Sequence, residues 1–251
     1  MEKYRGDDVT PRVLEVRNIS FSYNVKYPHA RTLKQVFVDV FQGVESEIKI
    51  TALTNINFQL GHGEVLGIIG NNGAGKSTLL KVISGILPPS SGEVSVYGSI
   101  APIIELGVGV SPDLTCRENI ELIGVLLGYE KKVIREGIHE ITAWAGLTEY
   151  LDLPVRTFST GMLARLAFAI ATFQSRELLM VDEVLSVGDR DFQTKSLMRI
   201  EDLIRDGEAT ILVSHDLSLI EDKATKVLWL DQGRQIMFGD PREVLYEYKK
   251  N

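Results

Sequence analysis

Cysteine and long apolar runs are both scarce in this sequence. Cys116 is the only cysteine, so no disulfide can form within the chain, and we expect a reducing compartment and a small Cys116 that is buried or half-buried. No apolar segment approaches the roughly 20 residues that a membrane-spanning helix needs. The first residues, MEKYRGDDVTPR, are polar and acidic and lack the features of a secretory signal. Any role at a membrane would therefore require a separate membrane protein.

Positive charge is also scarce. The 27 lysines and arginines are outnumbered by 34 aspartates and glutamates, which gives a net charge of −7. Nucleic acids and anionic lipids bind basic surfaces, so this balance argues against broad electrostatic binding to either partner. The hydrophobic content of 44% and the charged content of 24% are typical of a globular protein. The 251 residues are sufficient for one large domain or two closely packed ones.

Strand-like and helix-like segments alternate on both sides of a helical block. The stretches RVLEVRNISFSY and LTNINFQL predict half-buried strands, and GEVLGIIG predicts a strand covered on both faces. Residues 115–152 have helical periodicity. Beyond residue 175, the strand-like stretches ELLMVDE, ATILVSH and KVLWLDQGRQIMFG alternate with helical ones. We therefore predict an α/β fold with a parallel sheet and a helical insertion.

A break between the first two predicted strands contains the segment ARTLKQVFVDVF. Its apolar residues have helical spacing, which predicts a short amphipathic helix over residues 30–41. Two roles are open for this helix: it could pack on its own domain, or it could dock onto a partner.

The motif GNNGAGKST fits the phosphate-loop pattern G-x-x-x-x-G-K-[ST]. Its glycines allow the backbone to wrap phosphate oxygens, and the following helix start supplies N–H donors. Lys76 would neutralise the β- and γ-phosphates of ATP, and the Ser77 hydroxyl would bind Mg²⁺. An apolar strand precedes the motif and a helical run follows it, as this chemistry requires. We therefore predict that ATP contacts Gly70, Asn71, Asn72, Gly73, Ala74, Gly75, Lys76, Ser77 and Thr78.

A second apolar strand, LLMVDE, ends in two carboxylates. Following a phosphate loop, such a strand is typical of the metal-binding strand of a nucleotide site. Asp182 is placed to hold Mg²⁺ through its water, and Glu183 is placed to orient or activate the attacking water.

The stretch VRTFSTGMLARLAFAI predicts a helix that begins with Ser159, Thr160 and Gly161. Free N–H groups at such a helix start bind phosphate, yet no lysine follows the glycine. This element is therefore half of a phosphate-binding site, and we predict that another copy of the chain supplies the other half. ATP would then lie on the phosphate loop of one subunit and contact Ser159–Gly161 of the second subunit.

Together these elements resemble the ABC transporter ATPases over nearly the whole chain. The stretch FSTGM aligns with the family signature Leu-Ser-Gly-Gly-Gln, and DEVLSVGD aligns with the family's DEPTSALD. The resemblance implies that Asp189 is the aspartate of the D-loop, and that His215 in VSHDL senses the γ-phosphate and steadies the attacking water. It also implies that Tyr23 in FSY stacks on adenine, with Tyr27 as a nearby alternative.

At several positions the sequence differs from most of the family, and these differences point to one subfamily. Thr160 and Met162 replace a glycine and the glutamine of the signature, and Glu105 stands where most members have a glutamine, which makes it a candidate metal ligand. The stretches ELGVG, FSTGMLARLAFA and DEVLSVGDRDFQ resemble the ATPase subunits that export O-antigen and teichoic-acid-type polysaccharides. The helix predicted at 30–41 resembles an element that lies near the membrane gate in that subfamily.

The resemblance implies an α/β P-loop NTPase fold with a mixed sheet core, an antiparallel β subdomain and an inserted helical subdomain. We expect a single nucleotide-binding domain over residues 1–251. Residues 1–107 and 160–251 would form the core with the β subdomain, and residues 108–159 the helical subdomain. Some members of the subfamily carry a C-terminal carbohydrate-binding domain. Because the sequence ends at Asn251, directly after the last predicted helix, we expect the form without that domain.

The resulting prediction is the ATP-hydrolysing subunit of a polysaccharide exporter. Two copies would pair head to tail, bind ATP and Mg²⁺, and drive two copies of a separate transmembrane permease that handles a lipid-linked polysaccharide. The chain would lie peripherally on the cytoplasmic side of the inner membrane. One alternative is the ATPase of a lipid, drug or peptide transporter. The other is a soluble ABC protein acting on nucleic acid or the ribosome, which the acidic charge and the single cassette disfavour.

Overall fold

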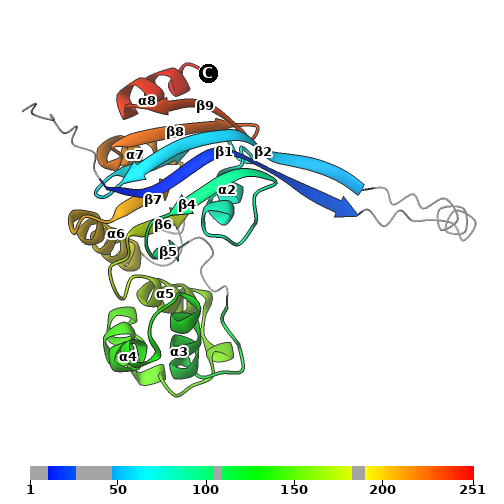
Figure 1. Ribbon diagram of the computed structural model, residues 1–251. Coiled ribbons are helices and arrows are strands. Elements are labelled where there is room, and N and C mark those ends of the chain that lie inside the picture. The colour runs from blue at the N-terminus through cyan, green and yellow to red at the C-terminus, as the bar shows by residue number, and fades with distance from the viewer. Residues whose placement is uncertain (1–10, 27–46, 104–108, 183–189) are drawn as a thin grey trace, which may run out of the picture.

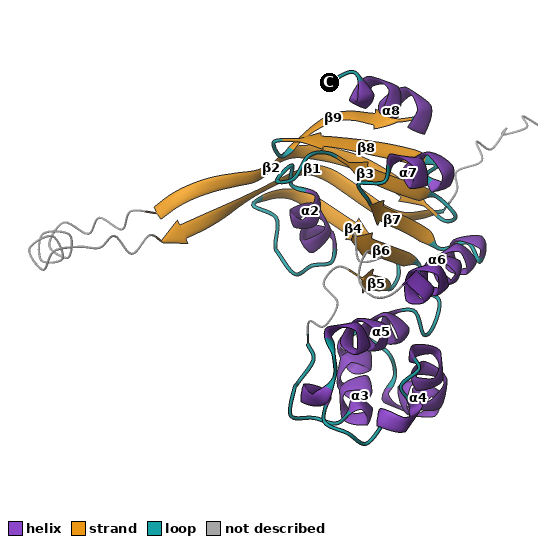
Figure 2. Ribbon diagram, turned by 180° about the vertical axis from the view of Figure 1, so that it is seen from behind, coloured by secondary structure: helices purple, strands orange, loops and turns teal. Residues whose placement is uncertain are grey.

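The computed structural model describes residues 11–26, 47–103, 109–182 and 190–251. Within these residues nine strands form one mixed sheet in the order β4-β1-β2-β9-β8-β3-β7-β6-β5 (Figures 1 and 2). The strands are β1 (Arg12–Lys26), β2 (Glu47–Gly61), β3 (Val65–Ile69), β4 (Ser91–Val96), β5 (Ile100–Ile103), β6 (Leu178–Asp182), β7 (Ala209–Val213), β8 (Lys226–Asp231) and β9 (Arg234–Gly239). The helix predicted at 30–41 lies outside the described residues.

Helices cover both faces of the sheet and form a separate layer beside it (Figure 2). The α-helices are α2 (Lys76–Ile83), α3 (Cys116–Leu126), α4 (Lys131–Ala145), α5 (Thr160–Ala171), α6 (Arg190–Arg205), α7 (Leu217–Lys223) and α8 (Pro241–Lys249). Two short 3₁₀ helices, Thr148–Tyr150 and Val155–Thr157, lie between α4 and α5.

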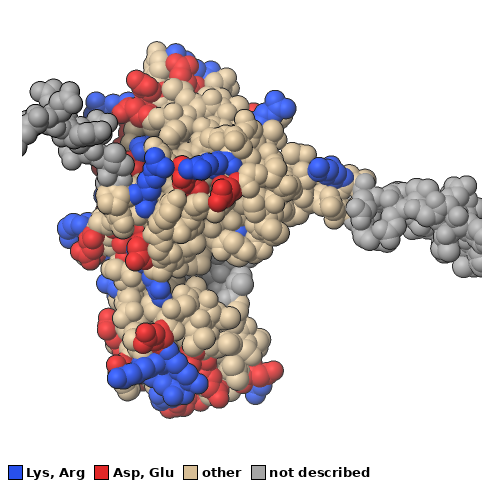
Figure 3. Space-filling view, in the orientation of Figure 1, with Lys and Arg blue, Asp and Glu red and all other residues tan. Residues whose placement is uncertain are grey.

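Two parts of the sheet have different strand directions. Strands β8, β3, β7, β6 and β5 pair in parallel, and all five residues of β3 are buried. A short apolar run with both faces covered is what a central parallel strand requires. At the other end of the sheet, β1 pairs antiparallel with both β2 and β4. The long β1–β2 ribbon extends away from the body (Figures 1 and 3). This arrangement confirms the α/β fold with a mixed sheet.

The two faces of the sheet have separate hydrophobic cores. On one face, Leu79, Leu80 and Ile83 of α2 pack among residues of β1, β2 and the central strands. On the other face, α6, α7 and α8 contribute Phe192, Ile220 and Val244. The sheet therefore fixes α2, and with it the loop that precedes α2, on one side and α6 on the other.

The inserted helices, which the periodicity of residues 115–152 predicts, have a third hydrophobic core of their own. Cys116 is buried there with residues of α3 and α4, as expected from the sequence. Local chemistry sets the ends of these helices. Thr115 and Glu118 form a reciprocal capping box at the start of α3, and Gly146 ends α4 with a left-handed φ of 68°. In the described residues, no helix is long and apolar enough to cross a membrane.

Helix α5 belongs to both the helical layer and the core over the sheet. Leu166, Ala169 and Ile170 pack in the helical layer, while Phe168 and Ala171 pack with α6 over the sheet. The sequence did not predict β4, β5 or α7. Each is short, and β4 is exposed at its first three residues, so none has a long periodic pattern.

Replacing Thr210 with valine is expected to raise the free energy of unfolding by about 1 kcal/mol. Thr210 in β7 is fully buried, and its hydroxyl has no hydrogen-bond partner in the part of the chain that the structure describes. Valine keeps the shape of the side chain and removes the unpaired polar atom. Urea unfolding of the two proteins measures the difference. Thr225→Val is the matched control and should lose stability, because the Thr225 hydroxyl accepts a hydrogen bond from the Val65 N–H at 2.9 Å. A loss of stability in Thr210→Val would contradict the prediction.

Candidate functional site

The loop of residues 70–75 joins the end of β3 to the start of α2, as the phosphate-loop motif predicts. Two of its glycines cannot be replaced without displacing backbone. A Cβ atom on Gly70 would lie 2.2 Å from the Leu230 carbonyl oxygen, and one on Gly75 would lie 2.8 Å from the Ala52 carbonyl oxygen. Both residues also have positive φ, 148° and 103°, which disfavours any side chain. The loop therefore packs tightly against β8 and β2 on its inner side.

The outer side of the same loop is open. Asn71, Asn72 and Gly73 are exposed, and a Cβ atom on Gly73 would meet nothing within 4 Å. The backbone N–H groups at the start of α2 lie at the positive end of the helix dipole. Open space beside these donors fits the phosphate groups of a nucleotide.

Lys76 is the first residue of α2 and is 7% exposed. Its Nζ donates hydrogen bonds to the carbonyl oxygens of Gly70, at 2.7 Å, and Asn71, at 3.1 Å. The ammonium group therefore spans the mouth of the loop. Held there, it is positioned to share its protons with phosphate oxygens that enter the loop.

Three neighbouring strands end at one edge of the sheet. In the parallel ladder, Ile68 of β3 pairs with Val213 of β7, and Val213 pairs with Asp182 of β6. The carboxyl ends of parallel strands meet at the same edge, so the phosphate loop, Asp182 and His215 after β7 lie together. Asp182 is half-buried, whereas His215 is exposed. The topology thus brings together three elements that are far apart in the sequence.

The donor set at this edge suits Mg²⁺. Ser77 is exposed at the start of α2, and Asp182 is the last residue of β6, two strands away from β3 in the sheet. Mg²⁺ prefers oxygen ligands and is bound through one or two protein groups, with water and phosphate completing its coordination. Among the described residues, no group of three or more His, Cys, Asp or Glu side chains is arranged to hold a metal ion.

Tyr23 of β1 lies beside the start of α2. Its hydroxyl is 3.3 Å from the Thr78 hydroxyl, and its ring makes an edge contact with Phe21 at 4.8 Å between centroids. The ring is 37% exposed, so one part of it is available to a ligand. The sequence did not predict the contact between Tyr23 and Thr78, because these residues are brought together only by the sheet.

Replacing Tyr23 with alanine is expected to raise the KM for ATP about tenfold, because stacking of a base on an aromatic ring contributes roughly 1–3 kcal/mol. Tyr23→Phe keeps the ring and loses only the contact with Thr78, so its KM should stay near the wild-type value. Tyr97→Ala is the control, since Tyr97 is an exposed tyrosine directly after β4. Steady-state ATP hydrolysis measures these effects. An unchanged KM in Tyr23→Ala would exclude Tyr23 and favour Tyr27, which lies outside the described residues.

The second predicted phosphate-binding element lies at the start of α5. Ser159 is the N-cap of this helix, and its hydroxyl accepts a hydrogen bond from the Met162 N–H at 3.2 Å. Ser159 and Thr160 are exposed, so the free end of the helix faces solvent. The two ribbon views place α2 against the sheet and α5 in the helical layer (Figures 1 and 2). Ser159–Gly161 therefore begin a different helix from the one that follows the phosphate loop, and their part in a shared site stays a prediction.

Three predicted site residues, Glu105, Glu183 and Asp189, lie outside the described residues. Glu183 directly follows the last residue of β6 in the sequence. Their assignments stay predictions.

The fold and this edge of the sheet define a P-loop nucleotide-binding protein. The sequence pattern of the ABC transporter family matches residues 53–186, which include the phosphate loop and Asp182. The chain belongs to the ABC transporter family, as the resemblance implied.

Several relatives share extensive sequence similarity with the chain. The O-antigen export system ATP-binding protein RfbE of Yersinia enterocolitica is 40% identical over 235 residues, which are 91% of this chain and 98% of that protein. The O-antigen export system ATP-binding protein RfbB of Myxococcus xanthus is 44% identical over 201 residues. The teichoic acids export ATP-binding protein TagH of Bacillus anthracis is 37% identical over 238 residues. The chain spans 46% of the length of the Myxococcus protein and 42% of the Bacillus protein.

Solved structures share the fold at lower sequence identity. An ATP-binding subunit of an ABC transporter superposes with a TM-score of 0.74 at 23% identity, covering 94% of this chain and 93% of that one. A dimeric ATP-binding cassette bound to ADP and Pi in a post-hydrolysis state superposes with a TM-score of 0.71 at 21% identity, covering 91% and 99%. These likenesses confirm the predicted fold class.

Proposed function

We propose that the chain is the ATP-hydrolysing subunit of an exporter that moves a polysaccharide across the cytoplasmic membrane. The observation that carries this proposal is the match to an O-antigen export ATP-binding protein at 40% identity over 98% of its length. It is supported by teichoic acid export proteins at 35–37% identity. Both cargoes are polysaccharide-type polymers, so the substrate class is shared although the relatives differ.

The proposed reaction is hydrolysis of ATP held on the phosphate loop. Lys76 binds the β- and γ-phosphates, and the N–H groups at the start of α2 surround their oxygens. Ser77 and Asp182 hold Mg²⁺, which neutralises charge on the phosphates when it is bound. Glu183 accepts a proton from the attacking water, and His215, at the adjacent strand end, steadies that water against the γ-phosphate. Phosphoryl transfer depends chiefly on such positioning and on charge neutralisation.

The second half of the site comes from another copy of the chain. In the proposed head-to-tail dimer, Ser159–Gly161 of one copy donate backbone N–H groups to the γ-phosphate on the other copy. Because ATP then contacts both chains, its binding closes the dimer and its hydrolysis opens it. In this proposal Asp189 also contacts the nucleotide, and Glu105 is a candidate ligand of Mg²⁺.

Closure and opening act on a separate membrane permease, present in two copies, which carries a lipid-linked polysaccharide. The chain would then lie peripherally on the cytoplasmic side of the membrane. Neither nucleic acid nor the ribosome is a partner in this proposal, because the net charge of −7 disfavours both.

Affinity purification from detergent-solubilised native membranes tests the proposal. The tagged chain is expected to bring down a membrane protein with several spans together with a lipid-linked glycan, both identified by mass spectrometry. The tag alone, expressed in the same cells, is the control. Recovery of a permease with a lipid, drug or peptide cargo would show that the substrate is not a polysaccharide. Recovery of the chain only from the soluble fraction, with nucleic acid or ribosomes, would contradict the proposal.

A further inference from the structure

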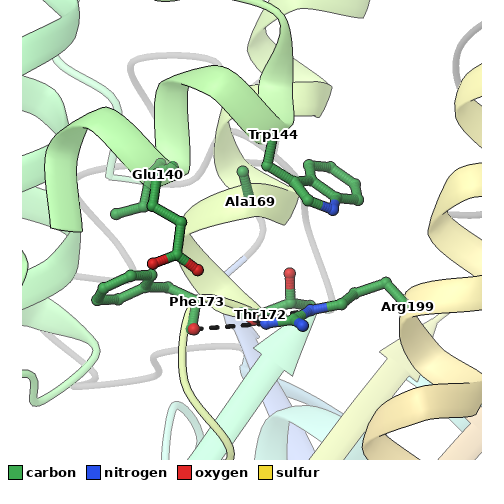
Figure 4. Close-up of a pocket in the computed structure, with 7 residues that line it drawn as sticks. Glu140, Trp144, Ala169, Thr172, Phe173 and Arg199 are labelled. Carbon is green, nitrogen blue, oxygen red and sulfur yellow. Dashed lines mark hydrogen bonds between the residues drawn. The ribbon is translucent and has the colours of Figure 1, made fainter.

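Helix α6 carries two cations that bind the carboxyl-terminal ends of two helices in the helical layer. The Arg199 guanidinium donates to the Thr172 carbonyl oxygen through Nη2 at 2.6 Å and Nε at 3.2 Å, and to the Phe173 carbonyl oxygen at 3.4 Å. Figure 4 shows Arg199 reaching from α6 toward Thr172 and Phe173. The Lys195 Nζ donates to the Trp144 carbonyl oxygen at 2.6 Å.

Both cations bind where a helix has unpaired carbonyl groups. Thr172 is the C-cap of α5, and Trp144 is the residue before the last of α4. The carboxyl-terminal end of a helix carries partial negative charge, so a cation there is stabilising. Lys195 and Arg199 are four residues apart and therefore lie on one face of α6. One face of α6 thus binds the carboxyl-terminal ends of α4 and α5.

An aromatic group joins the same three helices. Trp144 of α4 stacks on Phe168 of α5 with 5.2 Å between ring centroids, and both rings make edge contacts with Phe192 of α6. The Lys195 ammonium also lies 4.5 Å from the centroid of the Trp144 ring. The three helices therefore share an apolar contact and, beside it, hydrogen bonds from α6. Because hydrogen bonds depend on direction, they specify how α4 and α5 are oriented against α6.

A small, partly open hollow lies beside Arg199. A cavity of about 40 Å³ lies among Glu140 of α4, Thr172 and Phe173 at the end of α5, and Arg199 of α6. Figure 4 shows the carboxylate of Glu140 on the far side of this space from the Arg199 stem.

Helix α6 is also tied to the nucleotide site. It follows Asp182 in the sequence after residues 183–189, and its Ile200 and Leu203 pack over the sheet with Val181 of β6. Arg199 of α6 binds the carboxyl-terminal end of α5, and the opposite end of α5 begins with Ser159–Gly161. The contacts of α6 therefore connect the strand that ends in Asp182 to the helix whose start is proposed to bind the ATP of a second copy.

We infer that Lys195 and Arg199 are positioning residues that set the direction of the start of α5 relative to the sheet. They contact neither ATP nor the reacting atoms; they act through α4 and α5. This inference rests on the proposed function, because the orientation of α5 matters only if its start completes a site on another chain. Loss of either cation leaves the phosphate loop intact and weakens closure of the dimer.

The test uses Arg199→Met, Arg199→Lys and Lys195→Met, each in the full chain and combined with Glu183→Gln to retain ATP. Arg205→Met is the matched control, because Arg205 lies on α6 and is exposed, with an ion pair to Asp202 on the same helix. Titration with a fluorescent ATP analogue at low protein concentration measures nucleotide binding to the monomer. Analytical ultracentrifugation with ATP measures the dimer dissociation constant, and circular dichroism measures Tm.

Arg199→Met and Lys195→Met are expected to bind the analogue like the parent chain and to weaken ATP-dependent dimerisation about tenfold or more. Arg199→Lys keeps the charge and should recover part of the loss, while Arg205→Met should change nothing. A lower Tm with unchanged dimerisation would overturn the inference, since the cations would then only stabilise the fold. A parallel loss of analogue binding would also overturn it. A parent chain that binds ATP without dimerising would contradict the proposed shared site itself, and the inference would fail with it.

Discussion

Replacing Lys76 with methionine is expected to lower kcat/KM for ATP hydrolysis by a factor of about a hundred or more, the usual loss when one group that stabilises the transferring charge is removed. The Lys76 ammonium bridges the carbonyl oxygens of Gly70 and Asn71 across the mouth of the loop. Methionine keeps the length of the stem and removes both the charge and these hydrogen bonds. ATP binding should therefore weaken along with turnover.

Steady-state ATPase assays and titration with a fluorescent ATP analogue measure the two effects of Lys76→Met. Lys49→Met is the control, because Lys49 is exposed on β2 and makes no part of the loop. Circular dichroism should show the same fold in both variants. Turnover close to that of the wild type in Lys76→Met would mean that residues 70–78 are not the catalytic phosphate site.

Replacing Glu183 with glutamine is expected to lower kcat by roughly a hundred- to ten-thousandfold, the range for loss of a general base. The amide keeps the size of the side chain and cannot accept the proton of the attacking water. Lys76, Ser77 and Asp182 are unchanged, so ATP binding should be retained. The variant is therefore expected to accumulate as an ATP-bound dimer.

Single-turnover hydrolysis and analytical ultracentrifugation with ATP and Mg²⁺ measure these outcomes for Glu183→Gln. Glu64→Gln is a carboxylate control at the opposite end of β3, where Glu64 pairs with Lys226. Hydrolysis at the wild-type rate in Glu183→Gln would remove Glu183 from the mechanism. Loss of ATP binding instead would assign Glu183 to nucleotide or metal binding.

The sequence was informative wherever a pattern is local. The apolar run of β3, the glycines of the loop and the helix start at Ser159–Gly161 each depend on residues that are close together in the chain. Their elements were therefore predictable, as was the burial of Cys116. The loop between β3 and α2 was predictable in detail because Gly70 and Gly75 occupy positions that admit no side chain.

Contacts between distant parts of the chain were not predictable from one sequence. The hydrogen bond of Tyr23 to Thr78 depends on how β1 crosses the sheet relative to α2. In the sequence, Lys195 and Arg199 are indistinguishable from ordinary surface charges on an amphipathic helix. Only the positions of α4 and α5 in the structure show which groups they bind. The sequence shows only that these two cations are four residues apart, and this spacing is too common to predict a contact by itself.

In the proposed dimer, ATP is bound between the phosphate loop of one chain and the start of α5 of another. Disulfide cross-linking tests it directly, because native Cys116 does not interfere. Burial raises the pKa of the Cys116 thiol to about 11, so it stays protonated and unreactive at neutral pH. Two single-site variants, Asn72→Cys and Thr160→Cys, are made in the Glu183→Gln background. Both native residues are exposed.

The measurement is the amount of disulfide-linked dimer after mild oxidation of the mixed variants with ATP and Mg²⁺. We expect a linked dimer in the mixture, little in either variant alone, and a large decrease without ATP. Retained binding of a fluorescent ATP analogue by each variant shows that its own site is intact. Absence of the mixed cross-link in variants that bind ATP, or a link that forms equally well without nucleotide, would contradict the shared site.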